Sequence, residues 1–358
     1  RVKPAGGVRS LSRRYPATVG GRACMKHRPI VQRTSESVKP PEAARRMWKS
    51  VIPVIHRNQT GENMKNICII VNPAAGRRIH KKVAKACRQL EDAGAVPEVW
   101  HTRCPGDATG LARKALDNKF DVIVAAGGDG TVNEVVNGMA HTDTPLALLP
   151  FGTTNLFARE IGVHRRTHRA VDAILNGQTE RVHLGQAGDH YFMLMAGVGF
   201  DAHVVYGLNL RLKSFVGELA YIVSALKVIA TAPPRKCIEF SVNGDAPLKC
   251  SSLILGNAKY YGGSFEVTPG ANITKPQLEL CAFEGDNRRS IVGYAMGVLF
   301  KRHTRFKSVT ARSVEKLTVT ADQPTHVQVD GDYLGKLPLE FSIVPDALTI
   351  LRPPGALV

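Results

Sequence analysis

A strand-like run that opens into a glycine-rich turn and then a helix constrains this chain more than any other segment. Residues 120–126 are apolar at all but one position, as expected of a strand covered on both faces. Gly127, Gly128 and Gly130 follow, and without a Cβ their backbone can turn sharply and approach a ligand closely. A helix predicted over 131–140 would direct its free N–H groups and its dipole at the same place. The segment therefore predicts a phosphate cradle, although glycines at such a turn also occur in α/β proteins that bind nothing there.

Strand and helix patterns alternate through this part of the chain. They predict strands over 67–71, 97–101, 120–126 and 145–149, and helices over 79–93, 107–117 and 131–140. Such alternation indicates a parallel sheet with helices on both faces. Farther along, short apolar runs bounded by Gly, Pro and Asn indicate antiparallel strands. We therefore predict an α/β nucleotide-binding domain over 64–160 and a β-rich domain over 161–358.

Two more turns follow predicted strands on the same edge of the sheet. One begins at Asn72 and the other at Pro150, and both contain glycine with amide or hydroxyl side chains. Because parallel strands end at one edge, where ligands of open α/β sheets bind, the three turns are expected to converge on one ligand. The predicted phosphate-binding residues are Asn72, Pro73, Gly76, Arg77, Gly127, Gly128, Gly130, Thr131, Glu134, Gly152, Thr153, Thr154 and Asn155.

Taken together, these turns resemble the catalytic domain of the diacylglycerol kinase family, a lipid kinase branch of the NAD kinase–lipid kinase superfamily that includes bacterial and sphingosine kinase relatives. The resemblance runs from about residue 64 to 358 and continues through Ala196–Ala202, Ile254–Gly263 and Val329–Asp332. It implies a nucleotide site between an α/β domain and an antiparallel β domain. It also implies an enzyme of phospholipid synthesis that transfers the γ-phosphate of Mg²⁺-bound ATP to the hydroxyl of a diacylglycerol-like lipid.

Phosphoryl transfer needs positioning, charge neutralisation and one group that accepts the hydroxyl proton. The resemblance assigns that base to Asp330 and leaves Asp129, in the glycine turn, as a second candidate base or as an organiser of Mg²⁺ and phosphate. Asp332 stands where the family usually has Glu, and we assign Asp129 and Asp332 as metal ligands. Asp330-Gly331 is also the favoured sequence of a two-residue hairpin turn, and Glu134 equally suits a helix N-terminus without any ligand.

The chain departs from the family pattern at two places. Leu156 replaces an acidic residue of the second turn, and Lys275-Pro276 replaces an Asp-Gly pair. In some members the latter pair helps hold a structural magnesium ion, so we do not expect that ion here.

Charge and cysteine usage bound the cellular setting. Residues 1–63 hold 14 of the 48 Lys and Arg but only three of the 30 acidic residues, and they lack periodic apolar positions. We predict that they are disordered, either as a non-functional extension or artefact of the assigned start, or as a basic arm on anionic lipid. Seven cysteines without metal-ligand spacing predict reduced thiols in a cytoplasmic protein. No apolar stretch is long enough to cross a bilayer, so a protein with the lipid substrate that the resemblance implies would bind the membrane surface transiently. A homodimer stays open.

Other functions remain as alternatives. NAD kinases share the Gly-Gly-Asp-Gly cradle, but Asn133–Gly138 and the second turn resemble the lipid branch. A nucleotide-binding regulator without catalysis would be expected to lack Asp330. Nucleic acid is not an expected partner, because the basic excess does not form a periodic face with interleaved aromatics. A helix over 212–229 carries an apolar stripe that would pack on the sheet or line a pocket for lipid tails.

Overall fold

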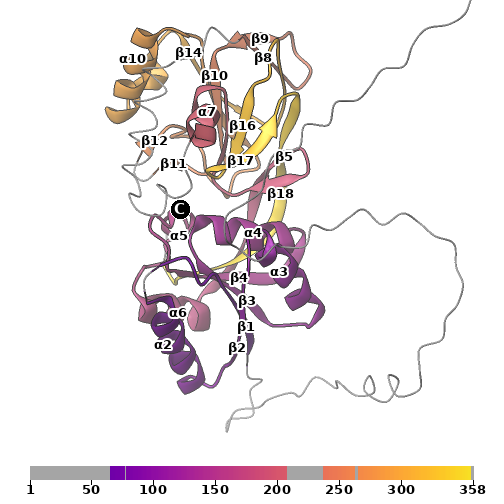
Figure 1. The fold of residues 1–358 in the computed structure, drawn as a ribbon, viewed down its shortest axis with the longest axis vertical. Coiled ribbons are helices and arrows are strands. Elements are labelled where there is room, and N and C mark those ends of the chain that lie inside the picture. Colours follow the sequence, from indigo (N-terminus) through magenta and orange to yellow (C-terminus); the bar gives the residue numbers. More distant parts are fainter. Residues whose placement is uncertain (1–64, 77, 208–236, 263–264, 356–358) are drawn as a thin grey trace, which may run out of the picture. The chain divides into compact units, whose positions relative to one another are not determined.

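Strands and helices alternate over the first part of the computed structural model, which describes residues 65–76, 78–207, 237–262 and 265–355. The elements are β1(Asn66–Val71), α2(Ile79–Asp92), β2(Val96–His101), α3(Asp107–Asp117), β3(Val122–Gly127), α4(Asp129–Met139) and β4(Thr142–Pro150). The four strands are parallel in the order β2-β1-β3-β4, and every residue of β3 is buried. Figure 1 shows α2 on one side of this sheet and α3 and α4 on the other. The predicted α/β architecture is confirmed.

The chain then leaves the parallel sheet through two short helices and enters antiparallel strands. These elements are α5(Leu156–Glu160), α6(Thr167–Asn176), β5(Gln178–Ala187), β6(His190–Phe192), β7(Met195–Val198), α7(Phe200–Gly207), β8(Ile238–Val242), β9(Leu248–Cys250), β10(Ser252–Gly256), β11(Tyr260–Tyr261), β12(Phe265–Glu266) and β13(Leu278–Phe283). The last elements are α10(Arg288–Leu299), the 3₁₀ helix η1(His303–Arg305), β14(Val309–Val314), β15(Lys316–Ala321), β16(His326–Val329), β17(Asp332–Lys336) and β18(Leu339–Arg352). The predicted β-rich part is therefore confirmed.

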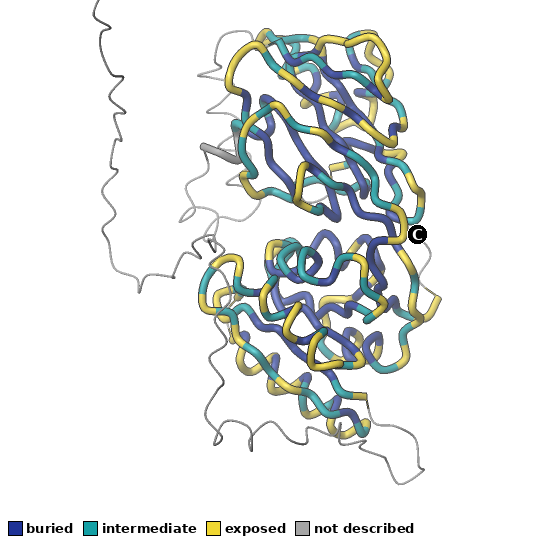
Figure 2. Tube along the Cα trace, turned by 90° about the vertical axis from the view of Figure 1, so that its right-hand side faces the viewer, coloured by how far each residue is buried: buried dark blue, intermediate teal, exposed yellow. Residues whose placement is uncertain are grey.

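One long strand joins the two parts. β18 lies parallel to β4 at its C-terminal end and antiparallel to β5 and β15, so one sheet continues from β2 to β9. A second sheet has the order β14-β13-β10-β7-β16-β17. Figure 2 shows buried segments of the chain running through both parts. The domain boundary at residue 160 stays a prediction, since the helix and strands that follow it pack and pair with elements on both sides.

Several predictions fall outside the described residues. These are the basic extension over 1–63, Arg77, and the apolar helix over 212–229. No helix of the described residues is both long and apolar enough to cross a bilayer.

The cysteines only partly match the expectation of reduced thiols. Cys68, Cys87, Cys237, Cys250 and Cys281 are free, and burial raises the pKa of the Cys68 thiol to about 12. Cys104 is disulfide-bonded, so the expectation was wrong for this residue. Spacing could not have indicated this bond, because Cys104 belongs to no local cysteine motif.

Candidate active site

The glycine turn between β3 and α4 leaves the N-terminus of a helix open. Gly128 precedes α4 in an extended conformation, and no side chain caps the helix. Free N–H groups and the positive end of the helix dipole thus lie beside glycines, the arrangement that favours bound phosphate. Gly127 has no room for a Cβ, which would lie 2.5 Å from Thr131 Oγ1. Gly130 faces Asp332, whose Oδ2 would be 3.6 Å from an added Cβ.

The second predicted turn lies directly against the first. A Cβ added to Gly152 would be 2.4 Å from Gly128 Cα, and the Gly152 N–H donates to the Gly127 carbonyl at 3.0 Å. Asn155 follows in the left-handed region with φ 54°, and its Nδ2 donates to the Gly152 carbonyl at 2.8 Å. Its buried Oδ1 has no hydrogen-bond partner among the described residues. Thr153 and Thr154 lie between these two residues.

The turn after β1 braces the other two. Asn72 Nδ2 donates to Thr131 Oγ1 at 3.1 Å, while Asn72 Oδ1 accepts from the Ala74 N–H at 2.9 Å. A Cβ on Gly76 would lie 2.9 Å from the carbonyl oxygen of Phe151. Asn72 therefore acts on the cradle through Thr131, and exposed Pro73 lies beside it. The structure thus brings the three turns together.

Sequence reasoning missed a cation at the second turn. Arg165 Nη2 donates to the Thr153 carbonyl at 2.9 Å and approaches the Gly152 carbonyl at 3.3 Å. It lies beyond the motif, and only the chain reversal after α5 brings it back to the turn.

Asp129 connects the first turn to α5. Its Oδ1 accepts the Phe157 N–H at 3.1 Å, at the start of that helix. Burial raises the pKa of the Asp129 carboxyl, and backbone N–H groups near Leu156 oppose the rise. Asp129 therefore holds the glycine turn to α5. The hydrogen bond uses a backbone N–H, so it does not require the acidic side chain that Leu156 replaces.

Asp330 lies in a dense cluster of hydrogen-bond donors. Its Oδ1 accepts the N–H groups of Leu194 and Met195, both at 2.9 Å. Its Oδ2 accepts the Met193 N–H at 2.9 Å and Asn133 Nδ2 at 2.7 Å. Burial raises the pKa of the Asp330 carboxyl to about 6, and these four hydrogen bonds oppose the rise. Four donors therefore hold the carboxyl group in one orientation.

The backbone around Asp330 is the hairpin turn that its sequence favours. Asp330 and Gly331 have φ 48° and 84°, and Val329 pairs with Asp332 across the turn between β16 and β17. Buried Gln328 supports the turn, since its Oε1 accepts the Gly331 N–H at 2.8 Å. Its Nε2 donates to Asp201 at 2.7 Å. The hairpin interpretation is therefore correct. The turn also directs the Asp330 side chain toward Asn133 on α4.

Two asparagines on α4 form the link that sequence reasoning missed. Asn133 contacts Asp330, and Asn137 exchanges hydrogen bonds with the backbone N–H and carbonyl of Tyr191 at 3.0 Å. Their spacing of four residues, which puts both on one helix face, was the available signal. α4 therefore carries the glycine turn at its first residues and holds Asp330 one helical turn later.

Glu134 points elsewhere. Its Oε2 accepts the Ala108 N–H at 3.1 Å at the start of α3, and its carbonyl accepts from Thr109 Oγ1. This contact stabilises the N-terminus of α3. Its assignment to nucleotide binding stays a prediction.

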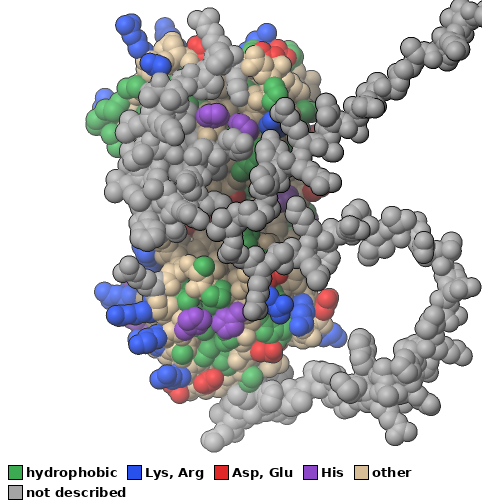
Figure 3. All heavy atoms as spheres, viewed as in Figure 1, with side chains coloured by type: hydrophobic (Ala, Val, Ile, Leu, Met, Phe, Trp, Pro, Cys, Tyr) green, Lys and Arg blue, Asp and Glu red, His purple; other side chains and the backbone are tan. Residues whose placement is uncertain are grey.

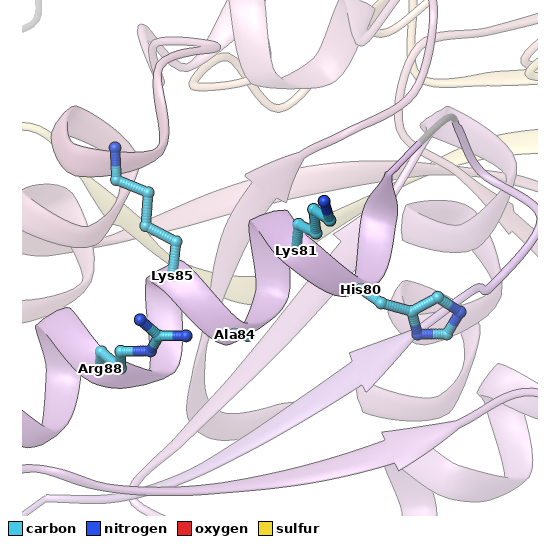
Figure 4. A pocket seen from close by; sticks show the side chains of 5 residues that line it. All are labelled: His80, Lys81, Ala84, Lys85 and Arg88. Atoms are coloured by element: carbon cyan, nitrogen blue, oxygen red, sulfur yellow. The ribbon is translucent and has the colours of Figure 1, made fainter.

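A described pocket lies apart from this cluster. It has a volume of about 650 Å³ and is lined by His80, Lys81, Ala84, Lys85 and Arg88, all from α2. Figure 4 shows these side chains spread along the helix without converging on a common point. Within the described residues, no group of three or more His, Cys, Asp or Glu is placed to hold a metal ion.

An α/β sheet with glycine turns at one edge, facing a carboxyl from a β-rich part, defines the NAD kinase–lipid kinase class of fold. Residues 66–187 match the diacylglycerol kinase catalytic domain, and residues 195–352 match the YegS C-terminal NAD kinase beta sandwich-like domain. The chain belongs to the diacylglycerol kinase family.

Named relatives match about four fifths of this chain. A diacylglycerol kinase of Bacillus subtilis (strain 168) is 33% identical over 283 residues, which are 78% of this chain and 93% of the relative. One from Staphylococcus epidermidis is 30% identical over 81% of this chain and 92% of its own length. The crystal structure of a diacylglycerol kinase from Bacillus anthracis str. Sterne has the same fold, with a TM-score of 0.67 at 23% identity over 83% of this chain and 100% of that one.

Proposed function

We propose that the protein is an ATP-dependent lipid kinase that transfers the γ-phosphoryl group of ATP to the hydroxyl of a diacylglycerol-like lipid. The observation that carries this proposal is the hydrogen bond from Asn133 to Asp330 at 2.7 Å. It sets a half-buried carboxylate one helical turn from an uncapped, glycine-lined helix N-terminus. Phosphoryl transfer uses these two features together.

In this proposal the three turns bind the nucleotide. The N–H groups at the start of α4 donate to phosphate oxygens. Gly128 and Gly152, which lie against each other, have no side chains that would block the approach of a phosphate. Arg165 adds positive charge beside the second turn. Asn155 Oδ1, which is buried without a partner among the described residues, would gain one if the turn moved to bind a phosphate or its water.

Asp330 accepts the proton of the attacking hydroxyl. As the lipid oxygen bonds to the γ-phosphorus, the bond from that phosphorus to the β–γ bridging oxygen breaks, and ADP leaves with the bridging oxygen. All four in-plane acceptor positions of Asp330 are filled, three of them by fixed backbone N–H groups. The hydroxyl therefore takes the place of Asn133, whose side chain can rotate and already contacts the Tyr191 carbonyl at 3.2 Å.

The family implies Mg²⁺ beside the phosphates, where it would neutralise their charge. Asp332 fits this ion, because it presents a carboxylate to the start of α4 at Gly130. Asp129 fits less well, since Phe157 N–H already occupies its Oδ1. We propose Asp332 as the protein ligand, and phosphate oxygens and water as the others.

The substrate also supports a location. A diacylglycerol-like lipid resides in a bilayer, so we propose a cytoplasmic protein that binds the membrane surface peripherally. This location also fits the proposed use of ATP, because the cytoplasm contains ATP on the side of the membrane where the protein would bind.

The pKa of Asp330 predicts the acid limb of the pH profile. A protonated carboxyl cannot accept the hydroxyl proton, so kcat should fall about tenfold per pH unit below a midpoint near pH 6. Initial rates on detergent-dispersed diacylglycerol, measured from pH 5 to 9 at saturating ATP, would test this. A flat profile from pH 5 to 7 would remove Asp330 from the role of base.

Asn133→Ala separates positioning from proton transfer. Losing one donor to the carboxylate should raise the pKa of Asp330 and move the acid limb up by about one pH unit, while kcat above pH 8 stays within a few-fold. Asn176→Ala is the matched control, because exposed Asn176 lies on α6 and its side chain donates to Asp172 rather than to Asp330. An unchanged acid limb in Asn133→Ala would contradict the proposed role of this contact.

The experiment that tests the function is label transfer from γ-labelled ATP to a panel of acceptors. We expect labelled phosphatidic acid from diacylglycerol, and at most trace label on sphingosine or NAD. Label on NAD alone would identify an NAD kinase. ATP binding without any transfer would identify a nucleotide-binding regulator.

A further inference from the structure

The outer face of α10 is apolar and exposed. Val292, Met296, Leu299 and Phe300 lie at spacings of four, three and one, so they share one side of the helix and its C-terminal end. Leu299 is 55% exposed and Phe300 is 64% exposed. Single exposed apolar residues are common, but four on one short helix mark an interaction surface. We call these four residues the α10 face.

The helix is firmly anchored on its other side. Asn287 Oδ1 accepts the Ser290 N–H at 2.9 Å and caps the N-terminus. Tyr294 Oη lies 2.9 Å from both the Gly285 N–H and Ser308 Oγ. Gly297 lies against the Phe306 ring, which an added Cβ would approach to 2.7 Å. The fold thus presents the α10 face on a fixed support, although exposing it gains nothing for stability.

Positive charge flanks this face. Arg289 lies at the N-terminal end, and Arg302, Arg305 and Lys307 follow the C-terminal end; all four are exposed, and none is ion-paired with another described residue. Lys301 also lies there but is paired with Glu266 at 2.8 Å. Glu284 and Asp286 precede the helix, so the C-terminal flank is the more basic one. Figure 3 shows hydrophobic side chains with Lys and Arg beside them at the edge where Figure 1 places α10.

We propose that the α10 face docks on an anionic lipid bilayer. Leu299 and Phe300 enter the boundary between headgroups and acyl chains, while Arg302, Arg305 and Lys307 contact lipid phosphates. A second copy of the chain is the weaker occupant. Because Arg289, Arg302, Arg305 and Lys307 outnumber Glu284 and Asp286 around this helix, a two-fold pairing brings two surfaces of net positive charge together.

This surface rests on the proposed peripheral location and specifies it, but it is separate from the proposed reaction. α10 lies in the β-rich part and contributes no residue to the three turns or to the Asp330 cluster. Docking is therefore expected without nucleotide or diacylglycerol. Its failure can be distinguished from failure of the proposed kinase activity, which detergent-dispersed substrate measures separately.

The test is co-sedimentation of the full-length protein with vesicles, without ATP. Wild type should bind vesicles with about 30% phosphatidylglycerol in phosphatidylcholine and bind pure phosphatidylcholine at least tenfold more weakly. Leu299→Ser with Phe300→Ser should lower the partition coefficient on the anionic vesicles at least tenfold. The matched control is Leu248→Ser, which changes a 45% exposed leucine on β9 and should bind as wild type.

A second variant tests the charge. Arg302→Glu with Arg305→Glu should also weaken binding to anionic vesicles at least tenfold, and Arg166→Glu with Arg169→Glu on the surface at α6 serves as its control. All variants should keep the wild-type melting temperature and their activity in detergent. Unchanged vesicle binding in the apolar double variant, or no binding by wild type, overturns the proposal. Loss of a wild-type dimer in that variant, seen by size-exclusion chromatography with light scattering, also overturns it and assigns the face to a second copy.

Discussion

Replacing Asp330 with asparagine should lower kcat by about 10²–10⁴-fold, the range typical for loss of a general base. Asparagine cannot accept the hydroxyl proton at neutral pH. Its Nδ2 would also face N–H donors that now point at a carboxylate oxygen, which should cost about 1–3 kcal/mol of folding stability. ATP affinity should remain near wild type, because the glycine turns are untouched. Single-turnover rates and calorimetry of ATP binding, both on the folded fraction, measure the two effects.

Asp129→Asn is the matched comparison. An asparagine Oδ1 can still accept the Phe157 N–H, so the link to α5 survives and ATP affinity should change only a few-fold. Its kcat should fall much less than that of Asp330→Asn. If Asp330→Asn turns over near the wild-type rate while Asp129→Asn is inactive with normal ATP binding, the roles are reversed and Asp129 is the base.

Gly152→Val should weaken ATP binding at least about 100-fold, which is roughly 2.7 kcal/mol. A Cβ at this position would lie 2.4 Å from Gly128 Cα and 2.9 Å from Asn155 Oδ1. The two turns would have to separate, and the N–H groups that we propose as phosphate donors would move with them. Calorimetric titration with ATP measures the change.

The neighbouring glycines provide graded controls. Gly128→Ala should disturb the fold less, because its Cβ would lie 3.4 Å from Gly152 Cα, an ordinary contact. A loss of ATP affinity in this variant would therefore mean that the new methyl group occupies space that phosphate needs. Gly110→Ala on α3 has nothing within 4 Å and should leave ATP affinity unchanged. Wild-type ATP affinity in Gly152→Val would remove the second turn from the nucleotide site.

The parallel sheet could be predicted from the sequence because its signals are local. A strand buried on both faces is a continuous apolar run, and the prediction for residues 67–71 differs from β1 by one residue. The convergence of the three turns followed from the parallel topology alone. β18 could not be predicted, because its place between β4, β5 and β15 depends on pairing across the whole chain.

In the candidate site, too, local features could be predicted from the sequence and long-range contacts could not. The sequence indicated Asp129, Asp330 and the glycines as functional, but not what each carboxylate contacts. Asp129 accepts from a residue 28 positions away, and Asn133 reaches Asp330 across 197 positions. Such contacts depend on tertiary packing, which also explains why Glu134 points to α3 rather than to the cradle.

The most direct test of the central claim follows the phosphoryl group itself. Full-length protein is incubated with diacylglycerol and ATP whose γ-phosphoryl oxygens are heavy isotopes, and the products are analysed by mass spectrometry. The account predicts phosphatidic acid that carries all the non-bridging heavy oxygens and the unlabelled hydroxyl oxygen of the lipid, with Asp330→Asn giving about 10²-fold less in the same time. Heavy oxygen found only in free phosphate or in NADP, or equal phosphatidic acid from Asp330→Asn, would contradict it.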